Sequence, residues 1–353
     1  MSLCTQTAAH ALAHMAEFDA IIDARSEDEF ALDHLPGAVN WPTLNNAERI
    51  SIGTLYTQVN PFEARKRGAA MAARNIAGHI DRHVIGLPRD WKPLAYCWRG
   101  GQRSGSLSMV LGQIGFRVTL LEGGYKAFRA AMVQDIGQRV AGLRFQVVCG
   151  PTGSGKTRLL QALDAQGAQV LDLEALANHR SSVLGAMPGL LQPSQKRFDT
   201  LVWDRLRSFN ALRPVFVESE SKKVGNLSVP LALMDAMRAA PCLTVQLPDP
   251  QRVALLLEDY DYLVRDVNHF CQRLAVLASF RGHALVARWQ AQARAGEFAP
   301  VVLELLTQHY DPAYRQSLER NFVRSGAAIT VAPYDHSMGA MSELSQQVMA
   351  LCG

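Results

Sequence analysis

Short apolar runs alternate along this chain with longer segments in which apolar residues recur every three or four positions. In the second half, five such runs are predicted strands: residues 145–149, 169–173, 215–218, 243–247 and 328–332. Helical patterns fill the intervals, and this alternation is typical of a parallel sheet with helices on both faces. The pattern therefore predicts a doubly wound α/β domain over residues 143–353, in which residues 250–322 are mostly helical.

The first half repeats the alternation on a smaller scale. Its apolar runs predict three strands, at residues 20–23, 94–97 and 118–121. The segment between the last two carries apolar residues on one helical face, at Leu107, Val110, Leu111 and Ile114. Gly115 follows as the expected helix end. A less regular helix is expected over residues 65–79. A linker at residues 134–143 then divides the chain into domains 1–135 and 143–353.

The bulk composition excludes several classes of protein. With 48% hydrophobic and 19% charged residues, the chain is neither disordered nor a coiled coil. A net charge of +4 permits a polyanionic partner without requiring one. The six cysteines show no paired spacing, which favours a reducing compartment. No signal peptide is visible, and no apolar run reaches the ~18 residues of a membrane span. We expect a cytoplasmic protein without membrane contact.

The clearest motif is the run GPTGSGKT at residues 150–157, directly after the predicted strand 145–149. It matches the phosphate-loop pattern in its proper strand–loop–helix context. Glycines let consecutive backbone N–H groups point at a phosphate, Lys156 neutralises an outer phosphate, and Thr157 can hold Mg²⁺. The phosphate-binding residues are expected to be Gly150, Gly153, Ser154, Gly155, Lys156 and Thr157. The pattern does not specify which phosphate compound binds.

A second motif, CWRGGQR, begins at Cys97, where a predicted strand ends. A helix is expected to start near Ser104, so Cys97 opens a loop that ends on a helix N-terminus. Two glycines let the loop amides face the sulfur, and two arginines add positive charge; such surroundings lower a thiol pKa and also bind anions. The sequence therefore predicts a nucleophilic Cys97 inside an anion-binding loop formed by Arg99, Gly100, Gly101 and Arg103.

Charged residues follow several strands of the second domain and are expected at the same sheet edge as the phosphate loop. Asp172 and Glu218 are candidates for contact with magnesium or substrate, while a plain loop carboxylate remains an equal alternative for Glu218. No metal is firmly assigned. Lys196, Arg197, Lys222 and Lys223 bring positive charge to this region. Contact with a nucleic-acid backbone and simple solvation both fit these four residues.

The N-terminal half carries further pieces of a recognisable pattern, in the order Asp23-Ala24-Arg25, Glu29-Phe30, residues 34–42, the Cys97 loop and Gly123-Gly124. Arg25 and Glu29 are expected to form a structural ion pair. The pattern resembles a single rhodanese domain over about residues 10–133. Asp33 stands where a glycine commonly precedes the histidine of that pattern, and Trp98 with the double glycine differs from ordinary thiosulfate-using members.

The two halves together resemble the bacterial tRNA 2-selenouridine synthase family. Residues 172–180, 192–195, 218–225 and 309–314 also look like that family's pattern, although the last has no independent chemical interpretation. The resemblance implies an α/β fold with an N-terminal rhodanese-like domain and a C-terminal P-loop NTPase-like domain. It also implies an enzyme that S-geranylates the wobble 2-thiouridine of tRNA with geranyl diphosphate and then replaces sulfur by selenium from selenophosphate.

The same resemblance makes Cys97 the catalytic cysteine and residues 150–157 the phosphate loop. The implied partners are the anticodon arm of tRNA and a selenophosphate-producing enzyme, with Mg²⁺ as an optional cofactor. Arg180 joins Lys196, Arg197, Lys222 and Lys223 as a candidate tRNA contact. Two alternatives stay open: an ATP-dependent kinase or NTPase with a rhodanese sulfur- or selenium-carrier domain, and a non-catalytic carrier that needs Cys97 but not Lys156.

Overall fold

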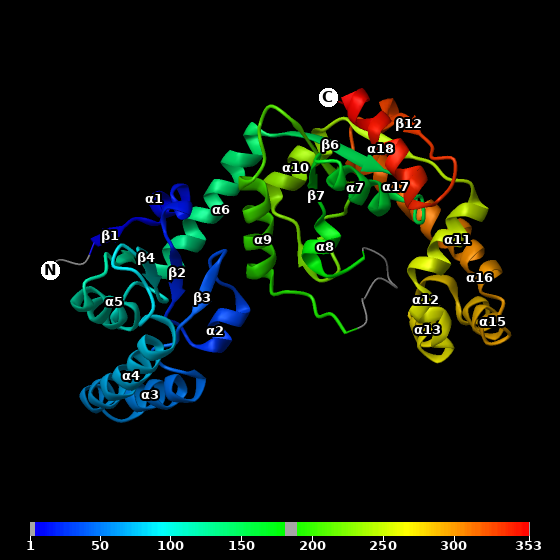
Figure 1. The fold of residues 1–353 in the computed structure, drawn as a ribbon. Coiled ribbons are helices and arrows are strands. Elements are labelled where there is room, and N and C mark those ends of the chain that lie inside the picture. The colour runs from blue at the N-terminus through cyan, green and yellow to red at the C-terminus, as the bar shows by residue number, and fades with distance from the viewer. Residues whose placement is uncertain (1–3, 181–188, 353) are drawn as a thin grey trace. The chain divides into compact units, whose positions relative to one another are not determined.

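The computed structural model describes residues 4–180 and 189–352 (Figure 1). The chain forms two compact units. The first unit comprises residues 1–136 and 193–204, and the second comprises residues 137–192 and 205–353. Among the described residues, no helix combines the length and the apolar composition that crossing a membrane requires. The two units are described in turn.

The first unit contains a parallel five-stranded sheet in the order β1-β5-β4-β2-β3. Its strands are β1 (Cys4–Gln6), β2 (Ala20–Asp23), β3 (Ala38–Asn40), β4 (Pro93–Tyr96) and β5 (Thr119–Leu121). The three strands predicted from the apolar runs are β2, β4 and β5, which are mostly buried. The edge strands β1 and β3 were missed because they are three residues long and partly exposed, so no apolar run marks them.

Six helices accompany this sheet: α1 (Ala8–Ala13), α2 (Glu27–Leu32), α3 (Asn46–Gln58), α4 (Pro61–His83), α5 (Gln102–Ile114) and α6 (Gly124–Gly142). Helix α5 has the predicted apolar face, with Leu107 and Leu111 fully buried, and ends at Gly115 in the left-handed conformation. Helix α3 was not predicted because none of its residues is fully buried, which leaves no apolar stripe in the sequence. The expected linker is also helical, since α6 continues to Gly142.

The segment 193–204 joins the first unit although it follows the phosphate loop in sequence. It contains most of helix α9 (Gln195–Arg207). The Trp203 side chain is fully buried, packs edge-on against Phe128 and donates its indole N–H to Asp135 at 2.7 Å. Thr200 donates to the buried Asp33 carboxylate at 3.0 Å. These contacts make the segment part of the core of this unit.

The second unit contains a parallel sheet in the order β12-β11-β6-β8-β7. Its strands are β6 (Arg144–Cys149), β7 (Gln169–Leu171), β8 (Pro214–Glu218), β11 (Cys242–Val245) and β12 (Ile329–Val331), and each is one of the predicted strands. Helices α7 (Lys156–Ala165) and α18 (Met338–Cys352) pack together over one hydrophobic core, and α10 (Leu231–Ala239) contacts β6. The predicted α/β fold class is confirmed.

Three small elements lie around this sheet: helix α8 (Leu173–Ala177) and a two-stranded hairpin of β9 (Lys223–Val224) and β10 (Leu227–Ser228). The predicted helical part follows β11 and contains α11 (Asp249–Asp259), α12 (Asp261–Arg265), α13 (Val267–Ala275), α14 (Ala278–Arg281), α15 (His283–Arg294), α16 (Phe298–Leu305), the π-helical turn η2 (Leu306–Tyr310) and α17 (Asp311–Asn321). These helices, yellow to orange in Figure 1, enclose a core of their own around the fully buried Trp289.

Replacing Trp203 by alanine should destabilise the first unit by about 3–5 kcal/mol, because a fully buried indole is removed and Asp135 loses its donor. Native-state hydrogen exchange is the appropriate measurement, with amides of β2 and β4 expected to lose protection and those of β6 and β8 to keep it. The partly exposed Trp98 provides a matched control, for which Trp98→Ala should have a small effect. Equal losses in both sheets would contradict the assignment of residues 193–204 to the first unit.

Candidate active site

Cys97 occupies the short loop between β4 and α5. Its side chain is 3% exposed, and the Ser104 hydroxyl, on the first turn of α5, donates to its sulfur at 3.1 Å. Two glycines fix the loop. Gly100 has φ +67°, and a Cβ there would lie 2.8 Å from the Leu121 carbonyl oxygen; Gly124 has φ +57°, and a Cβ there would clash with the Cys97 carbonyl. The loop therefore depends on glycine at both positions.

The first two carbonyls of this loop accept hydrogen bonds from the protein, whereas its backbone N–H groups remain available to a ligand. Tyr125 and Lys126, at the start of α6, donate their backbone N–H groups to the carbonyls of Cys97 and Trp98 at 2.8 and 3.1 Å. Within the described part of the chain, the backbone amides of residues 98–101 donate no hydrogen bond to another protein atom. Together with the exposed Arg99, these amides are able to receive an anion beside the sulfur.

Arg103 lies at this loop, but its charge is shared with Glu29. The guanidinium donates to the Glu29 carboxylate at 2.6 Å, and Arg49 approaches the same carboxylate at 3.2 Å. Burial alone would raise the pKa of Glu29, and the hydrogen bond and charge of Arg103 lower it. Glu29 also caps its own helix α2 through the backbone N–H of Ser26. Arg103 is therefore held in place rather than free to swing towards a ligand.

The expected ion pair between Arg25 and Glu29 is wrong. Arg25 is 1% exposed and pairs instead with Asp23 at 2.6 Å, while its guanidinium lies 4.0 Å from the centroid of the Tyr125 ring. The physical reason is that Glu29 is already engaged by its capping box and by Arg103, and Asp23 reaches Arg25 from the end of the same strand. The pair is part of the core of the first unit.

Asp33, the residue that departs from the rhodanese pattern, has a structural explanation. It is 1% exposed, and one of its carboxylate oxygens accepts hydrogen bonds from Tyr125 at 2.7 Å and Thr200 at 3.0 Å. Burial raises its pKa, while these donors and the guanidinium groups of Arg129 and Arg197 act in the opposite direction. A glycine could not accept these bonds, so Asp33 is the residue that holds helix α9 in this unit.

The candidate tRNA contacts Lys196 and Arg197 therefore lie in the unit of Cys97. The Lys196 ammonium is 5.7 Å from the centroid of the Trp98 ring, and Arg197 donates to the carbonyl of His34 at 3.3 Å. Lys222 and Lys223, exposed at the hairpin β9–β10, belong to the other unit. The four lysine and arginine residues are thus divided between the two units, two in each.

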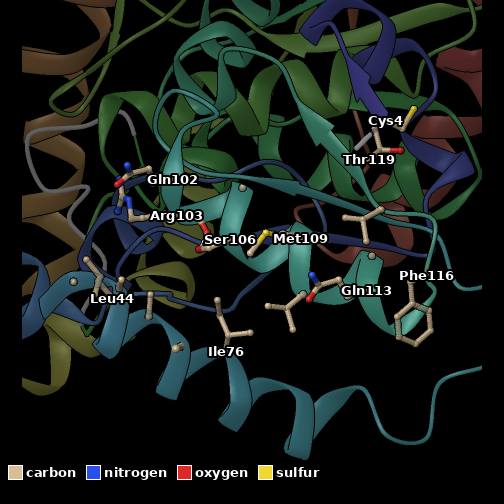
Figure 2. A pocket seen from close by; sticks show the side chains of 18 of the residues that line it. Cys4, Leu44, Ile76, Gln102, Arg103, Ser106, Met109, Gln113, Phe116 and Thr119 are labelled. Atoms are coloured by element: carbon tan, nitrogen blue, oxygen red, sulfur yellow. Dashed lines mark hydrogen bonds between the residues drawn. The ribbon is translucent and has the colours of Figure 1, made fainter. Parts of the chain in front are cut away.

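A groove that the sequence did not indicate runs along α5 in the first unit. Figure 2 shows Gln102 and Arg103 at one end of it, Met109 and Gln113 along its side, and Phe116 at the other end. Helix α4 forms the opposite wall, with small residues facing α5: Gly68, Ala69, Ala72 and Ala73. Because Gln102 and Arg103 also belong to the Cys97 loop, the groove begins next to that loop.

The phosphate loop of the second unit has the expected geometry. Gly153 and Gly155 have φ of +77° and +88°, and a Cβ at Gly150 would clash with the Ser154 hydroxyl, which is fully buried beneath the loop. The Lys156 ammonium donates to the Gly150 carbonyl at 2.6 Å and lies 5.5 Å from the centroid of the Tyr314 ring. The loop thus needs its glycines and holds its lysine over an aromatic face.

The phosphate loop borders a cavity of about 290 Å³. Thr157 lies on its wall, as does Arg180, which donates to the Asp259 carbonyl at 3.0 Å and lies 4.7 Å from the centroid of the Tyr260 ring. Arg180 is therefore brought next to Lys156, as a second cation in the same cavity. Lys222 and Lys223 are not among the residues that line it.

Three carboxylates gather on the wall of this cavity: Glu174, Glu218 and Glu220, whose oxygens lie within 4.8 Å of one another. Glu218 is 1% exposed and accepts the backbone N–H of Glu174 at 3.0 Å. Burial raises its pKa well above the usual value, and the charges of Glu174, Glu220 and Asp172 add to this. Such a cluster of oxygens suits a divalent cation.

Asp172, the other candidate from the sequence, caps helix α8 by accepting the Ala175 N–H at 2.8 Å and is not among the residues that line the cavity. Glu174 and Glu220 were missed. The signal for Glu220 was present in the run Glu-Ser-Glu at the end of β8, where a second acid follows Glu218 by two residues. Glu174 could not be found in this way, because the position of α8 decides whether it reaches the cavity.

The residues 309–314, for which the sequence offered no chemistry, brace the phosphate loop. Tyr314 accepts the backbone N–H of Gly150 at 2.7 Å. Asp311 binds the guanidinium of Arg252 at 2.5 Å, and Arg252 in turn donates twice to the Thr152 carbonyl, at 2.8 and 3.0 Å. Arg252 is 3% exposed, so this charge is held entirely by protein groups. The brace connects the helical part to the phosphate loop.

In the absence of divalent cations, the wild type should lose stability as the pH rises above 4.5, and Glu218→Gln should not show this loss. Because the pKa of Glu218 is raised above its usual 4.5 in the folded protein, the folded state binds the proton more tightly than the unfolded chain. The free energy of unfolding therefore falls as the pH rises from 4.5 through the raised pKa of Glu218. Glutamine does not titrate, so the variant lacks this pH dependence. Melting temperatures in EDTA from about pH 5 to about pH 8 measure the effect. Glu319→Gln, at an exposed carboxyl, is the control, and identical pH profiles for wild type and Glu218→Gln would refute the prediction.

Comparison with known protein families agrees with this geometry. The rhodanese-like domain family matches residues 6–131, and the tRNA 2-selenouridine synthase AAA domain family matches residues 143–281. The first match covers β2 to β5 with the Cys97 loop, and the second covers the phosphate loop, the carboxylate cluster and helices α11 to α13.

Proteins named tRNA 2-selenouridine synthase align over most of this chain, although the alignment covers slightly less than two thirds of several of them. A tRNA 2-selenouridine synthase from Nitrosomonas europaea is 35% identical over 244 residues, and the aligned part covers 68% of this chain and 63% of that protein. Proteins of the same name from Chromohalobacter salexigens and Bordetella bronchiseptica are 32% and 31% identical over 85% and 89% of this chain, and over 88% and 93% of their own lengths. The chain belongs to the tRNA 2-selenouridine synthase family.

Proposed function

We propose that this protein is an enzyme that converts the wobble 2-thiouridine of tRNA to 2-selenouridine in two steps. In the first, the sulfur attacks geranyl diphosphate, so that an S–C bond forms, the C–O bond breaks, diphosphate leaves and the uridine releases its N3 proton. In the second, selenium from selenophosphate bonds to C2 while the C2–S bond breaks and geranylthiolate leaves. Water then cleaves the Se–P bond and releases phosphate.

The observation that carries this proposal is the presence of two anion-binding sites of different chemistry in one chain, the phosphate loop and the amide-lined Cys97 loop. In the first step, the amides of residues 150–157 would hold the diphosphate, and Lys156 and Arg180 would stabilise its charge as it departs. The Tyr314 ring below Lys156 and the Arg252 brace fix the loop for this task.

The carboxylate cluster fits a divalent cation such as Mg²⁺. Glu174, Glu218 and Glu220 would hold it from the side of β8, and the Thr157 hydroxyl from the phosphate loop. A bound cation supplies positive charge that neutralises a diphosphate. Its charge would also favour the ionised form of Glu218, whose pKa burial raises.

In the second step, Cys97 would act within the amide bowl of its loop. The Ser104 hydroxyl donates to the sulfur at 3.1 Å and so holds it at the N-terminus of α5. The role that fits this arrangement is the positioning of selenophosphate next to C2, by the loop amides and Arg99 beside the Cys97 sulfur. This role would place the selenium chemistry in the first unit and the diphosphate chemistry in the second.

We further propose that tRNA is bound by both units, through Lys196 and Arg197 in the first and through Arg180, Lys222 and Lys223 in the second. Trp98 is 36% exposed beside Lys196, and an aromatic ring next to a cation suits an unstacked nucleobase. A selenophosphate-producing enzyme would supply the selenium donor, and the cytoplasm is the expected compartment because tRNA is the substrate.

Nucleoside mass spectrometry of 2-thiouridine-containing tRNA tests the proposal. With geranyl diphosphate and selenophosphate, the wild type should form 2-selenouridine. Cys97→Ala should stop at geranylated thiouridine because it removes the sulfur of the Cys97 loop, and Lys156→Ala should stop before it because it removes the cation of the phosphate loop. Cys4→Ala, at an exposed cysteine, is the control and should behave as wild type. Unchanged tRNA together with ATP turnover would overturn the proposal in favour of an NTPase.

Binding of tRNA should weaken when either basic group is neutralised. Lys196→Ala and Lys222→Ala should each reduce affinity and lower the slope of log affinity against log salt by roughly one, as expected for one lost phosphate contact. Filter binding at several salt concentrations measures this. The exposed Lys92, which belongs to neither group, is the control. If both variants show the same slope of log affinity against log salt as the wild type, these lysines do not contact phosphates and are only solvated surface residues.

A further inference from the structure

A second, apolar cavity lies in the helical part of the second unit, directly beside the phosphate loop. Its walls come from α11, α12, α13, α16 and the π-helical turn η2. They consist of leucine, valine, phenylalanine and tyrosine side chains together with one residue of the phosphate loop: Thr152, Leu256, Leu257, Tyr260, Leu263, Val264, Phe270, Phe298, Val302, Leu305, Leu306 and Tyr310. No local sequence pattern marks the location of this cavity.

The apolar cavity and the phosphate cavity share a wall. Four residues line both of them: Thr152, Leu256, Tyr260 and Tyr310. The backbone of the phosphate loop itself touches the shared wall, because a Cβ at Gly153 would lie 3.0 Å from the Leu256 side chain. The Thr152 carbonyl, held by Arg252, fixes the loop at this junction. An apolar cavity therefore lies directly beside the residues that would hold the phosphates of a ligand.

The chemistry of the walls decides which kind of ligand extends into this cavity. A nucleotide would bring a ribose and a base, whose polar groups would lose water without finding hydrogen-bond partners among leucine, valine and phenylalanine side chains. A hydrocarbon chain loses nothing there and gains from leaving water. We infer that this cavity receives the isoprenoid chain of the allylic diphosphate held by the phosphate loop, an inference that rests on the proposed function.

The cavity is narrow, with a volume of about 50 Å³. A ten-carbon chain needs more room than this, so its entry must part the walls. The turn η2 is the element suited to move, because π-helical hydrogen bonding is rare and is found mostly at functional sites. By contrast, Leu263, Phe270 and Leu305 on the far wall belong to the buried core around Trp289 and stay in place. The length of the apolar cavity would then select the length of the isoprenoid chain.

Calorimetric titration without tRNA tests this inference. The probes are inorganic diphosphate, dimethylallyl diphosphate, geranyl diphosphate and ATP. The wild type should bind geranyl diphosphate at least about tenfold more tightly than inorganic diphosphate, with dimethylallyl diphosphate between them, because each buried methylene adds affinity. Val302→Phe fills the apolar cavity and should abolish this advantage while leaving the affinity for inorganic diphosphate unchanged, which also shows that the variant is folded.

The neighbouring Leu303 provides the matched control. It lies on the same helix α16, is 39% exposed and does not line the apolar cavity, so Leu303→Phe should leave every affinity as in the wild type. Equal binding of geranyl diphosphate by Val302→Phe and wild type would overturn the inference, and so would tighter binding of ATP than of geranyl diphosphate. Because tRNA is absent, these outcomes are independent of tRNA modification. If the wild type binds geranyl diphosphate with this advantage but leaves tRNA unchanged, only the proposed function is refuted, and the inference about the apolar cavity stands.

Discussion

The buried guanidinium of Arg252 is the interaction on which the phosphate-binding unit depends. It is almost inaccessible to solvent, and its charge is balanced by Asp249 and Asp311 while two of its N–H groups meet the Thr152 carbonyl. Removing one partner of such a buried pair leaves an uncompensated charge, which commonly costs about 3–5 kcal/mol. The phosphate loop therefore has its shape fixed by helices that follow it by 100 residues or more in sequence.

This dependence explains why the helical part is present at all. A phosphate loop needs a strand before it and a helix after it, and β6 and α7 provide both. The helical part adds Tyr314, which accepts the Gly150 N–H, and the apolar walls beside Thr152. The same segment that positions the loop thus forms the second cavity. The phosphate cavity and the apolar cavity therefore share a wall and are not built from separate elements.

The first unit solves a similar problem with different groups. A thiol loop must keep its carbonyls satisfied and its amides available, and the start of α6 takes both carbonyls. Gly124 makes this possible because no side chain fits against the Cys97 carbonyl. Tyr125, the next residue, donates to Asp33 and lies under the Arg25 guanidinium. Two consecutive residues of α6 therefore connect the reactive loop to the ion pairs of the core.

The strands, the phosphate loop and the Cys97 loop could be predicted from the sequence because each is determined by a pattern of consecutive residues. Strands β6, β8 and β11 are continuous apolar runs, and the glycines of residues 150–157 act on their own neighbours. Helix α3 could not be predicted in this way, since it has no buried face, and the edge strands β1 and β3 are too short to leave a pattern.

The missed site residues share a different cause, which is distance along the chain. Asp33 and Thr200 are separated by 167 residues, and Arg252 lies 59 residues before Asp311. Glu174 reaches Glu218 only because β7, which precedes α8, and β8 end at the same edge of the sheet. No local pattern distinguishes these residues from solvated charges. The Arg25–Glu29 pair was mistaken for a different reason, because two acidic residues lie near Arg25 in sequence and the pattern does not decide between them. Pairing between charges is decided by which partner the fold brings closer, and for Arg25 that partner is Asp23.

In the proposed reaction, the two anion sites have different chemical tasks. A departing diphosphate needs many donors and positive charge, and the cavity with Lys156 and Arg180 offers both. A selenium or sulfur nucleophile needs a site in which its charge is stabilised only moderately, because strong stabilisation would make it unreactive. The Cys97 loop meets this need with backbone amides and a serine hydroxyl, while the carboxylate of Glu29 moderates the charge of Arg103. One site cannot satisfy both requirements, which gives a physical reason for joining two folds in one chain.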